Sequence, residues 1–266
     1  ALDAANPKSY LYAENLLNYS QNVAITTSWG ASNMTISPTP VLAPNGTLTA
    51  NSVVETAAAG AYHYINQVIT RPTANAYYTF SAYVKSSTRQ ITLRMETSSG
   101  GGVVAGYNVI STPATTGPTT GAYNTGYSNF TPSIENFANG WCRISASAYI
   151  SDGASNLALA IFTSNTASNP IYDGNVNSGF FVWGPQLERS NVANPYVSTA
   201  AANVIASTTL TNLISSNNSG TLISYPIYNS TNKSFTFNGG TTDQYVTGNL
   251  STIAAGSNVT TEAIIK

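Results

Sequence analysis

The chain has 266 residues, of which only 20 are ionisable near neutral pH: nine Lys or Arg, ten Asp or Glu, and His63. Charged residues make up 7% of the chain, against about a quarter in an ordinary soluble domain. A net charge of −1 provides no attraction for nucleic acid or an anionic membrane. The scarcity of carboxylates disfavours catalysis by proton transfer, which needs titratable groups within reach of each other. Polarity comes mainly from Asn, Ser and Thr, which together exceed a third of the residues and suit neutral polar partners such as glycans.

Alternation with a period of two runs along most of the chain, as in strands with one buried face. Asn-Gly and Asp-Gly pairs that favour turns separate the alternating runs, as at Asn139-Gly140 and Asp152-Gly153. The apolar share of 42% is enough for a core, and no stretch of 12 or more residues has a capped helical period. The pattern predicts an all-β fold of antiparallel strands in two sheets packed face to face. In chain order, the apolar positions of these runs are Tyr78, Phe80, Ala82 and Val84; Ile91, Leu93 and Met95; Cys142, Ile144, Ala146, Ala148 and Ile150; Leu157, Leu159 and Ile161; and Phe181, Trp183 and Leu187.

The connections between these runs are uneven in length. Gly100–Ser133 is rich in Gly, Thr and Pro, and predicts a long surface loop with one strand near Val103–Ile110. Val192–Ser207 is small and polar without alternation, which indicates a linker. A second strand-rich segment follows, and its last expected strand, Thr260–Ile265, leaves an unpaired edge that further chain or another subunit would cover. We expect an N-terminal arm (1–14), a sandwich domain (15–199), a linker (200–209) and the start of a second sandwich (210–266).

Outward-facing aromatic residues are the main chemical signal in the sequence. Sugar rings stack their C–H faces on aromatic side chains, while sugar hydroxyls need polar partners. If their strands are neighbours, the outward residues could line one sheet surface and bind a glycan. A subunit interface or plain solvent exposure remains an alternative, since Tyr and Arg are also enriched at interfaces. The candidate residues are Tyr77, Tyr83, Arg94, Glu96 and Tyr149.

Other conspicuous residues favour structural roles. Trp29, Trp141 and Trp183 are expected in the core or at sheet edges, and the single Cys142 is expected to be a small buried apolar residue without a disulfide. Glu135 and Arg143 flank the Asn139-Gly140 turn and could pair across it.

The sequence shows no catalytic residue and no metal ligand set, and we expect no cofactor. His63 has no second histidine with which to form a metal site or a catalytic triad. Asp152, Asp173 and Asp243 lie in Gly-containing turns. Calcium suits such loops, but the isolated spacing favours local turn hydrogen bonds.

Several motifs in order resemble the carbohydrate-binding-module-like jelly rolls of bacteriophage virion proteins, notably tail and capsid-attached fibres. The resemblance spans about Asn15 to Thr199. It implies a jelly-roll sandwich, a place on the virion surface and closed assembly, commonly as a trimer, with other virion proteins as partners and a cell-surface glycan as ligand. The motifs are Asn15-Leu-Leu-Asn-Tyr-Ser20, Trp29, Pro44-Asn-Gly-Thr47, Tyr77-Tyr-Thr-Phe-Ser-Ala-Tyr-Val-Lys85, Asn139-Gly-Trp-Cys-Arg-Ile144, Phe181-Val-Trp-Gly-Pro-Gln-Leu-Glu188 and Pro195-Tyr196-Val197.

The second segment resembles the opening strands of laminin-G or concanavalin-A-like lectin domains. The resemblance rests on Ser219-Gly-Thr-Leu222, Ser234-Phe-Thr-Phe-Asn238 and Asp243-Gln-Tyr-Val246. Asn238 stands where that family commonly has an acidic residue, so a family calcium site is not expected here.

Together the two resemblances imply a non-enzymatic virion fibre protein that acts as adhesin or spacer. A capsid decoration protein and the binding module of a secreted glycan-active enzyme are the alternatives.

Overall fold

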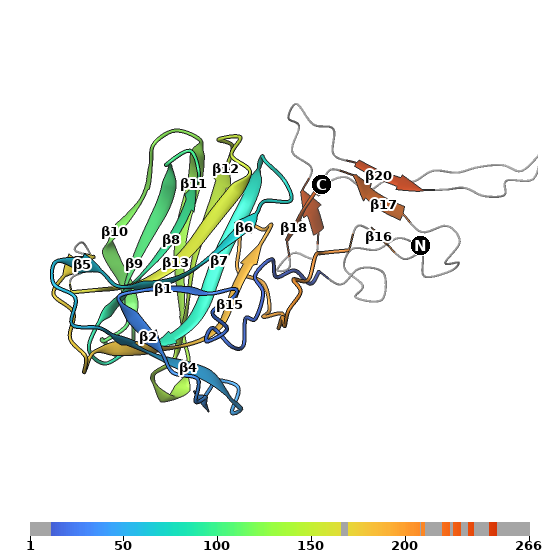
Figure 1. Ribbon diagram of the computed structural model, residues 1–266. Helices are drawn as coiled ribbons and strands as arrows, with labels where there is room; N and C mark the ends of the chain where they lie inside the picture. The colour runs from blue at the N-terminus through green and yellow to red at the C-terminus, as the bar shows by residue number, and fades with distance from the viewer. Residues whose placement is uncertain are drawn as a thin grey trace, which may run out of the picture. The chain divides into compact units, whose positions relative to one another are not determined.

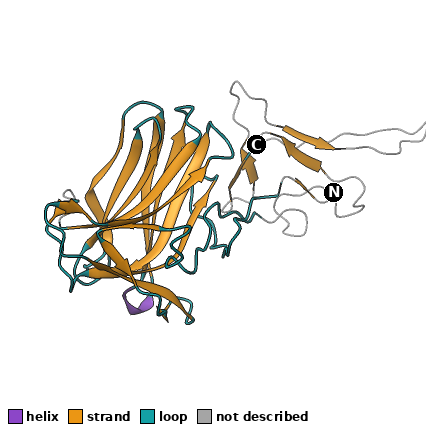
Figure 2. Ribbon diagram, viewed as in Figure 1, coloured by secondary structure: helices purple, strands orange, loops and turns teal. Residues whose placement is uncertain are grey.

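The computed structural model describes residues 12–165 and 170–207, and five short segments beyond them: 209–210, 220–223, 226–229, 234–236 and 245–248. The chain divides into two compact units, Ala13–Ala206 and a second made of Ala1–Tyr12 with Ser207–Lys266. The first unit is a sandwich of two antiparallel sheets, with one short 3₁₀ turn at Ala138–Gly140 among its described residues (Figures 1 and 2). The all-β sandwich predicted from the alternation is therefore confirmed. In the part of the chain that the structure describes, no helix has the length and apolar character to cross a bilayer.

The first sheet has six strands in the order β1-β6-β13-β8-β9-β10. All its neighbours pair antiparallel, and β13 lies between β6 and β8. A two-stranded pairing of β5 with β14 lies outside both large sheets. The bounds are β1 Gly30–Ser32, β5 Ala61–Tyr62, β6 Tyr64–Thr70, β8 Gln90–Thr97, β9 Gly102–Asn108, β10 Thr115–Tyr123, β13 Asn156–Ser164 and β14 Ile171–Tyr172.

The second sheet has the order β11-β12-β7-β15-β4-β2, with β3 paired to β4 off this path. The chain passes from one sheet to the other between β10 and β11, through a turn in which Asn124 and Gly126 both have positive φ. The bounds are β2 Met34–Ile36, β3 Val41–Leu42, β4 Leu48–Glu55, β7 Ala76–Lys85, β11 Tyr127–Asn136, β12 Cys142–Ile150 and β15 Gly179–Glu188.

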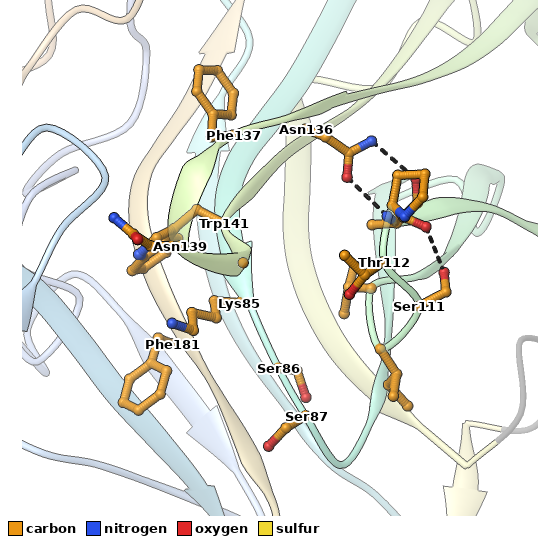
Figure 3. A pocket seen from close by; sticks show the side chains of 15 residues that line it. Lys85, Ser86, Ser87, Ser111, Thr112, Asn136, Phe137, Asn139, Trp141 and Phe181 are labelled. Carbon is orange, nitrogen blue, oxygen red and sulfur yellow. Dashed lines mark hydrogen bonds between the residues drawn. The ribbon is translucent and has the colours of Figure 1, made fainter.

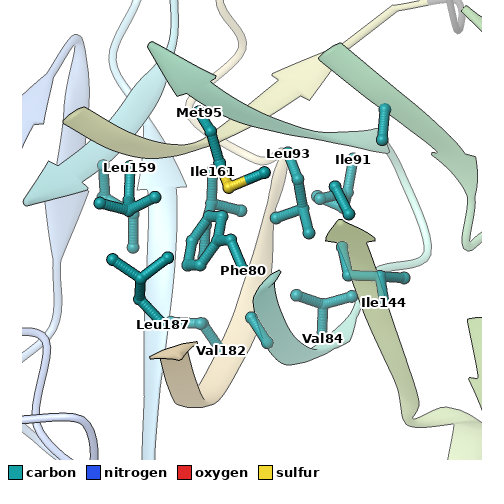
Figure 4. Packing of buried hydrophobic residues seen from close by; sticks show 14 of the residues in the cluster. Phe80, Val84, Ile91, Leu93, Met95, Ile144, Leu159, Ile161, Val182 and Leu187 are labelled. Atoms are coloured by element: carbon teal, nitrogen blue, oxygen red, sulfur yellow. The ribbon is translucent and has the colours of Figure 1, made fainter. Parts of the chain in front are cut away.

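The core lies between the two sheets and takes alternate residues from central strands such as β7, β8, β12 and β13 (Figure 4). Phe80 and Val84 of β7 face Leu93 and Met95 of β8, and all four are fully buried. Burying one large apolar side chain contributes about 1.5–3 kcal/mol, so this shared layer holds the sheets together. Ile144, Ala146 and Ala148 of β12 lie in the same layer, as the alternation predicts.

The strand expected near Val103–Ile110 is confirmed as β9, but the long loop expected over the rest of Gly100–Ser133 is wrong. This region forms most of three strands, β9, β10 and β11, of which β10 and β11 are the edges of their sheets. An edge strand pairs on one side only and needs no continuous apolar face, so Gly, Thr and Pro are tolerated there. Pro132 lies within β11 at such an edge.

The inward parity expected for Phe181 and Trp183 is also wrong. Phe180 and Val182 point into the core, and after a register shift between Trp183 and Gln186 so does Leu187. Gly184 lies in this bulge with φ of +58°, a conformation that favours glycine. An inserted residue reverses the alternation, so Trp183 packs on the opposite side of the sheet from Leu187.

The segment expected as a linker, Val192–Ser207, packs on the sandwich through most of its length. Thr199 donates a hydrogen bond to the Leu17 carbonyl at 2.7 Å and is buried. Asn15 and Val204 form an antiparallel bridge. A segment of small polar residues without alternation can therefore pack against one domain, and need not be a linker between two domains.

The second unit is described only in short strands. β17 (Gly220–Ile223) lies between β16 (Thr209–Leu210) and β20 (Tyr245–Gly248), and β18 (Ile227–Asn229) pairs with β19 (Ser234–Thr236). Tyr12 stacks on Tyr228 with ring centroids 5.7 Å apart. The predicted strand at Thr260–Ile265, the turn at Asp243 and residues 1–11 of the predicted arm lie outside the described residues.

Six of the thirteen charged residues of the sandwich form three buried or largely buried ion pairs. Arg189 binds Glu14, Arg71 binds Asp152 at 2.9 Å, and Arg89 binds Glu55 at 2.7 Å. Glu55 also accepts hydrogen bonds from the Tyr172 hydroxyl and the Asn175 amide. Burial opposes ionisation of Glu55, yet these donors together hold its pKa below the ordinary value.

Replacement of Glu55 by Gln should destabilise the sandwich strongly. The side chain of Glu55 is fully buried and that of Arg89 is 13% exposed, so the variant leaves a guanidinium without its countercharge. We expect the free energy of unfolding in urea to fall by about 3 kcal/mol. The control is Glu96→Gln, because Glu96 pairs with Arg94 at 2.8 Å on the surface and should cost less than about 1 kcal/mol. Equal losses in both variants would contradict this account of the buried pair.

Candidate functional site

The five residues predicted as a glycan site lie on two different sheets. Tyr77 and Tyr83 belong to β7 and Tyr149 to β12, which are neighbours in the seven-stranded sheet. Arg94 and Glu96 belong to β8 in the six-stranded sheet. Each set faces outward from its own sheet, so the five cannot line one surface. The alternation identified outward positions correctly, but it carries no information about which strands share a sheet.

Arg94 and Glu96 are engaged with their own neighbours. Arg94 binds Glu96 at 2.8 Å and donates from Nε to the Tyr123 hydroxyl at 2.9 Å. Its guanidinium also lies 5.4 Å from the centroid of the Tyr123 ring and 6.0 Å from that of Phe162. The Arg94 guanidinium is therefore already engaged by Glu96 and by two aromatic side chains on the outer face of its own sheet.

The outer face of the seven-stranded sheet contains a hollow of about 270 Å³, here called the outer groove. Its floor is made by Thr131 and Ser133 of β11 with Ser145 and Ser147 of β12. Glu135 and Arg143 lie beside them, and residues 191–193 form the wall. The register explains the floor: β11 and β12 place Thr131 beside Ser147, Ser133 beside Ser145 and Glu135 beside Arg143. Every second residue of both strands faces out, and most of these residues carry hydroxyls.

At one end of the outer groove, the outward side chains of β12 and β7 are both tyrosines. Tyr149 pairs with Tyr77 in register, and their rings meet edge to face with centroids 5.3 Å apart. Asn129 donates to the Tyr77 hydroxyl at 2.7 Å. Both tyrosines are partly exposed, so they offer ring surface to a ligand at this end.

Tyr83 lies beside Arg143 at the other end and is held by aromatic neighbours. Its ring centroid is 5.1 Å from that of Trp183 and 5.4 Å from that of Phe137. Trp183 in turn packs on Tyr196 with centroids 4.5 Å apart. Burial raises the pKa of Tyr83, while Arg143 opposes the rise. The hydroxyl therefore stays protonated, and the ring is fixed in orientation.

The wall of the groove is fastened to the sheet by buried hydrogen bonds. Thr79 donates to the carbonyl of Ser190 at 2.7 Å, and its hydroxyl lies 2.7 Å from that of Ser147. Asn194 donates to Glu188 from both its backbone at 2.9 Å and its side chain at 2.6 Å. The chain after β15 is thereby folded back over the outer face.

Glu188 is a fully buried carboxylate beneath this wall. Burial raises its pKa to about 7, although Gln186, Asn194 and the charge of Arg143 favour the ionised form. The protonation state of Glu188 therefore changes in the physiological pH range. No sequence pattern marks this residue, because its burial depends on the fold of the segment that follows it.

Arg143 supplies hydrogen-bond donors to the groove. It is 7% exposed, its Nη2 donates to Ser81 at 3.0 Å, and its guanidinium lies 5.3 Å from the Tyr83 ring centroid. Within the described residues its Nε has no partner. The ion pair expected between Glu135 and Arg143 does not form among these residues, although the register places the two side by side. Groove residues thus offer a cation, a carboxylate and several hydroxyls to a ligand.

The residues expected to be structural are buried. Trp29 is in the main core, whereas Trp141 and Trp183 form a second cluster with Ala43 and Ala50. Cys142 is in the core, and burial raises its pKa to about 12, as expected for an unreactive thiol.

The remaining ionisable residues also have local surroundings. His63 is fully buried, with its ring stacked 4.8 Å from that of Tyr172. Asp173 accepts a hydrogen bond from the Gly60 amide at 2.7 Å, and this contact joins two segments distant in the sequence instead of closing a local turn. Among the described residues, no group of three or more His, Cys, Asp or Glu could hold a metal ion.

Neither the models of known protein families nor the curated proteins give a match to this sequence. Among solved structures, the chain is similar to the xylan-binding CBM22-1 domain of Paenibacillus barcinonensis Xyn10C, with 13% identity, a TM-score of 0.39, and 69% of this chain and 99% of that one covered. It is also similar to TmCBM61, determined in complex with β-1,4-galactotriose, with 9% identity, a TM-score of 0.37, and 67% and 100% covered.

A third similar structure is the enzymatically active domain of tailspike protein 4 of bacteriophage CBA120, with 13% identity and a TM-score of 0.38. That match covers 65% of this chain but only 21% of the tailspike chain. Identities this low assign no role to any residue of this chain.

Replacement of Glu188 by Gln should remove a pH dependence of stability. A carboxyl whose folded pKa is raised binds its proton more tightly when folded, so it stabilises the protein below the unfolded pKa. That stability is lost as pH rises through about 7. We expect the free energy of unfolding of the parent protein to fall between pH 5 and pH 8, with a slope of at most about 1.4 kcal/mol per pH unit. In Glu188→Gln this decline should be absent, and in the control Glu135→Gln it should persist. A decline that survives in Glu188→Gln would assign the effect to another group.

Proposed function

We propose that the sandwich is a non-enzymatic glycan-binding domain of a bacteriophage virion protein, part of a tail or capsid-attached fibre on the particle surface. The protein serves there as adhesin or spacer. The single observation that carries the binding role is the outer groove, where a hydroxyl floor lies next to a partly exposed tyrosine pair.

The chemistry of the groove suits a neutral oligosaccharide. Each sugar hydroxyl both donates and accepts, and the groove offers both: donors on Arg143, acceptors on Glu135 and hydroxyls that do either. Arg143 and Glu135 contribute opposite charges, so the lining has no net preference for an ionic ligand. Tyr77 and Tyr149 supply the apolar surface on which a sugar ring stacks.

The groove is preformed, which reduces the entropic cost of binding. Its floor belongs to two paired strands, and its wall is fixed by the bonds from Asn194 to Glu188. A rigid site loses little conformational freedom when a ligand enters. Weak individual contacts to a sugar can then add up to useful affinity.

The virion role rests on the composition and on the resemblance of the motifs. A surface with few charges avoids non-specific electrostatic adhesion to cells and debris. Many copies on one particle would convert a weak glycan affinity into firm attachment through multivalency. A non-enzymatic role fits the way the sandwich uses its carboxylates, since Glu14, Glu55 and Asp152 are consumed in buried ion pairs.

A glycan array with matched variants tests the groove. We expect the parent protein to bind one or more neutral glycans, and Tyr149→Ala and Arg143→Gln each to weaken binding by roughly tenfold. Arg94→Gln is the matched control, because Arg94 lies on the other sheet. Arg143 is buried, so loss of binding in Arg143→Gln can also reflect misfolding. Tyr149→Ala is an independent second test, because Tyr149 is partly exposed and its replacement should not disturb the fold. Unchanged binding in both groove variants would remove the proposed site, and absence of binding to every glycan would leave only the spacer role.

The fibre assignment predicts assembly. Light scattering coupled to size exclusion should give a closed oligomer, commonly a trimer for fibres, with a hydrodynamic radius larger than that of a compact particle of the same mass. A stable monomer that binds particles stoichiometrically would instead favour a decoration protein.

A further inference from the structure

A second hollow lies at one end of the sandwich, away from the floor of the outer groove (Figure 3). It has a volume of about 600 Å³ and is here called the rim pocket. Three segments surround it: 85–87 from the end of β7, 109–114 between β9 and β10, and 136–141 from the end of β11 to the start of β12. Phe181 of β15 closes one side. We propose that this pocket binds a carboxylate-bearing sugar unit, such as a hexuronate.

The walls of the rim pocket are held in place without a ligand. Asn136 accepts the Ala114 amide at 2.8 Å and donates to the Ala114 carbonyl at 3.1 Å, which fastens two of the connections together. Ser111 donates to the carbonyls of Asn108 and Pro113 at 3.0 and 2.9 Å. The Asn136 amide is thereby committed to the framework, so it shapes the pocket and leaves recognition to other residues.

The pocket presents apolar surface that a soluble sandwich would ordinarily cover. Phe137 is 38% exposed, Phe181 is 36% exposed and Ile110 is 44% exposed, and all three line the same hollow. Isolated exposed apolar residues are common, but two aromatic rings and a branched chain around one concavity mark a binding site. The flat faces of the two phenylalanines can stack against the C–H face of a sugar ring.

Lys85 gives the pocket its charge preference. Among the described residues that line it, Lys85 alone is charged, and no described Asp or Glu lines this hollow or the adjoining one of about 200 Å³. Within the described residues the Lys85 ammonium has no ion-pair partner. A carboxylate that entered the pocket would therefore meet one cation and no competing anion, and a charge-assisted hydrogen bond would favour it over a neutral group.

The position of Lys85 is set by its neighbours. The register pairs Lys85 with Phe181, so the ammonium and one phenylalanine ring stand side by side on the same face. The lysine stem also passes close to the turn: a Cβ placed on Gly140 would lie 3.4 Å from Lys85 Cε. Gly140 has φ of +76° and follows Asn139 at +61°, which makes this tight turn. One cation next to one ring matches a sugar that carries one carboxylate.

The rim pocket differs from the outer groove in a way that experiment can separate. Groove residues carry both signs of charge, through Glu135 and Arg143, whereas the rim pocket carries only Lys85. The choice of a sugar as ligand rests on the proposed function, but the preference for an anion does not. Binding at the rim pocket should therefore depend on Lys85 and be indifferent to Tyr149.

The test is ligand-observed NMR and calorimetry on the full chain with two matched probes, methyl β-glucuronide and methyl β-glucoside. We expect the charged probe to bind roughly tenfold more tightly, with a preference that shrinks as salt rises. Lys85→Met, which keeps an unbranched apolar stem beneath Gly140, should abolish the preference, and Lys85→Arg should retain most of it. Phe181→Ala should weaken both probes, and Tyr149→Ala should leave the affinity for methyl β-glucuronide unchanged.

Equal affinity for the two probes in the parent protein, or a preference that survives Lys85→Met, would overturn the proposal. Sodium acetate is the third probe. If acetate competes as well as methyl β-glucuronide, the site recognises a bare anion and the sugar assignment is wrong. The outer groove is tested by a separate experiment, the binding of a neutral glycan by Tyr149→Ala, which does not involve Lys85. Failure of the groove proposal can therefore be told apart from failure of the rim-pocket proposal.

Discussion

The two-residue alternation of β7 is the constraint on which the rest of the sandwich depends. Its inward residues, from Tyr78 to Val84, are fully buried in the core, and its outward residues serve the opposite side. Tyr77 and Tyr83 lie at opposite ends of the outer groove, and Lys85 lines the rim pocket. Because side chains alternate strictly, a slip of one residue would expose the core and bury both sites at once. Neighbours on both sides, β12 and β15, make such a slip costly. Stability and recognition are therefore fixed by the same strand register.

The scarcity of charge has a second consequence, because the sandwich uses six of its thirteen charged residues in internal pairs. Arg71, Arg89 and Arg189 each hold a buried carboxylate, and each pair joins segments distant in the sequence. Buried pairs of this kind contribute specificity of arrangement, since an unpaired buried charge is far more costly than a paired one. What remains for the surface of the sandwich is a small set, including Lys85, Arg94, Glu96 and Glu135. Each remaining charge acts against a nearly neutral background, so a single lysine can decide the charge preference of a hollow.

Much of the fold could be predicted from the sequence, because burial on one face leaves a direct imprint of apolar alternation. β7, β8, β12 and β13 follow this pattern and were located correctly. Edge strands leave a weaker imprint, which is why β10 and β11 resemble a loop in the sequence, and the bulge at Gly184 reversed the expected side of Trp183. The candidate site was predicted only in part. Outward residues can be recognised in each strand separately, but the order of strands in a sheet is set by long-range pairing. Arg94 and Tyr83 therefore look equivalent in the sequence although they lie on different sheets.

The two hollows meet at the end of β11, where two successive residues line one hollow each. Glu135 lines the outer groove, and the next residue, Asn136, lines the rim pocket, since successive side chains of a strand point to opposite faces. The ring of Phe137, which also lines the rim pocket, packs on Tyr83 beside the groove. A carboxylate thus stands on the groove side of this border, and a phenylalanine and a lysine stand on the pocket side. The preference for an anion therefore belongs to the pocket side, where Lys85 is unopposed, whereas Glu135 and Arg143 offset each other on the groove side.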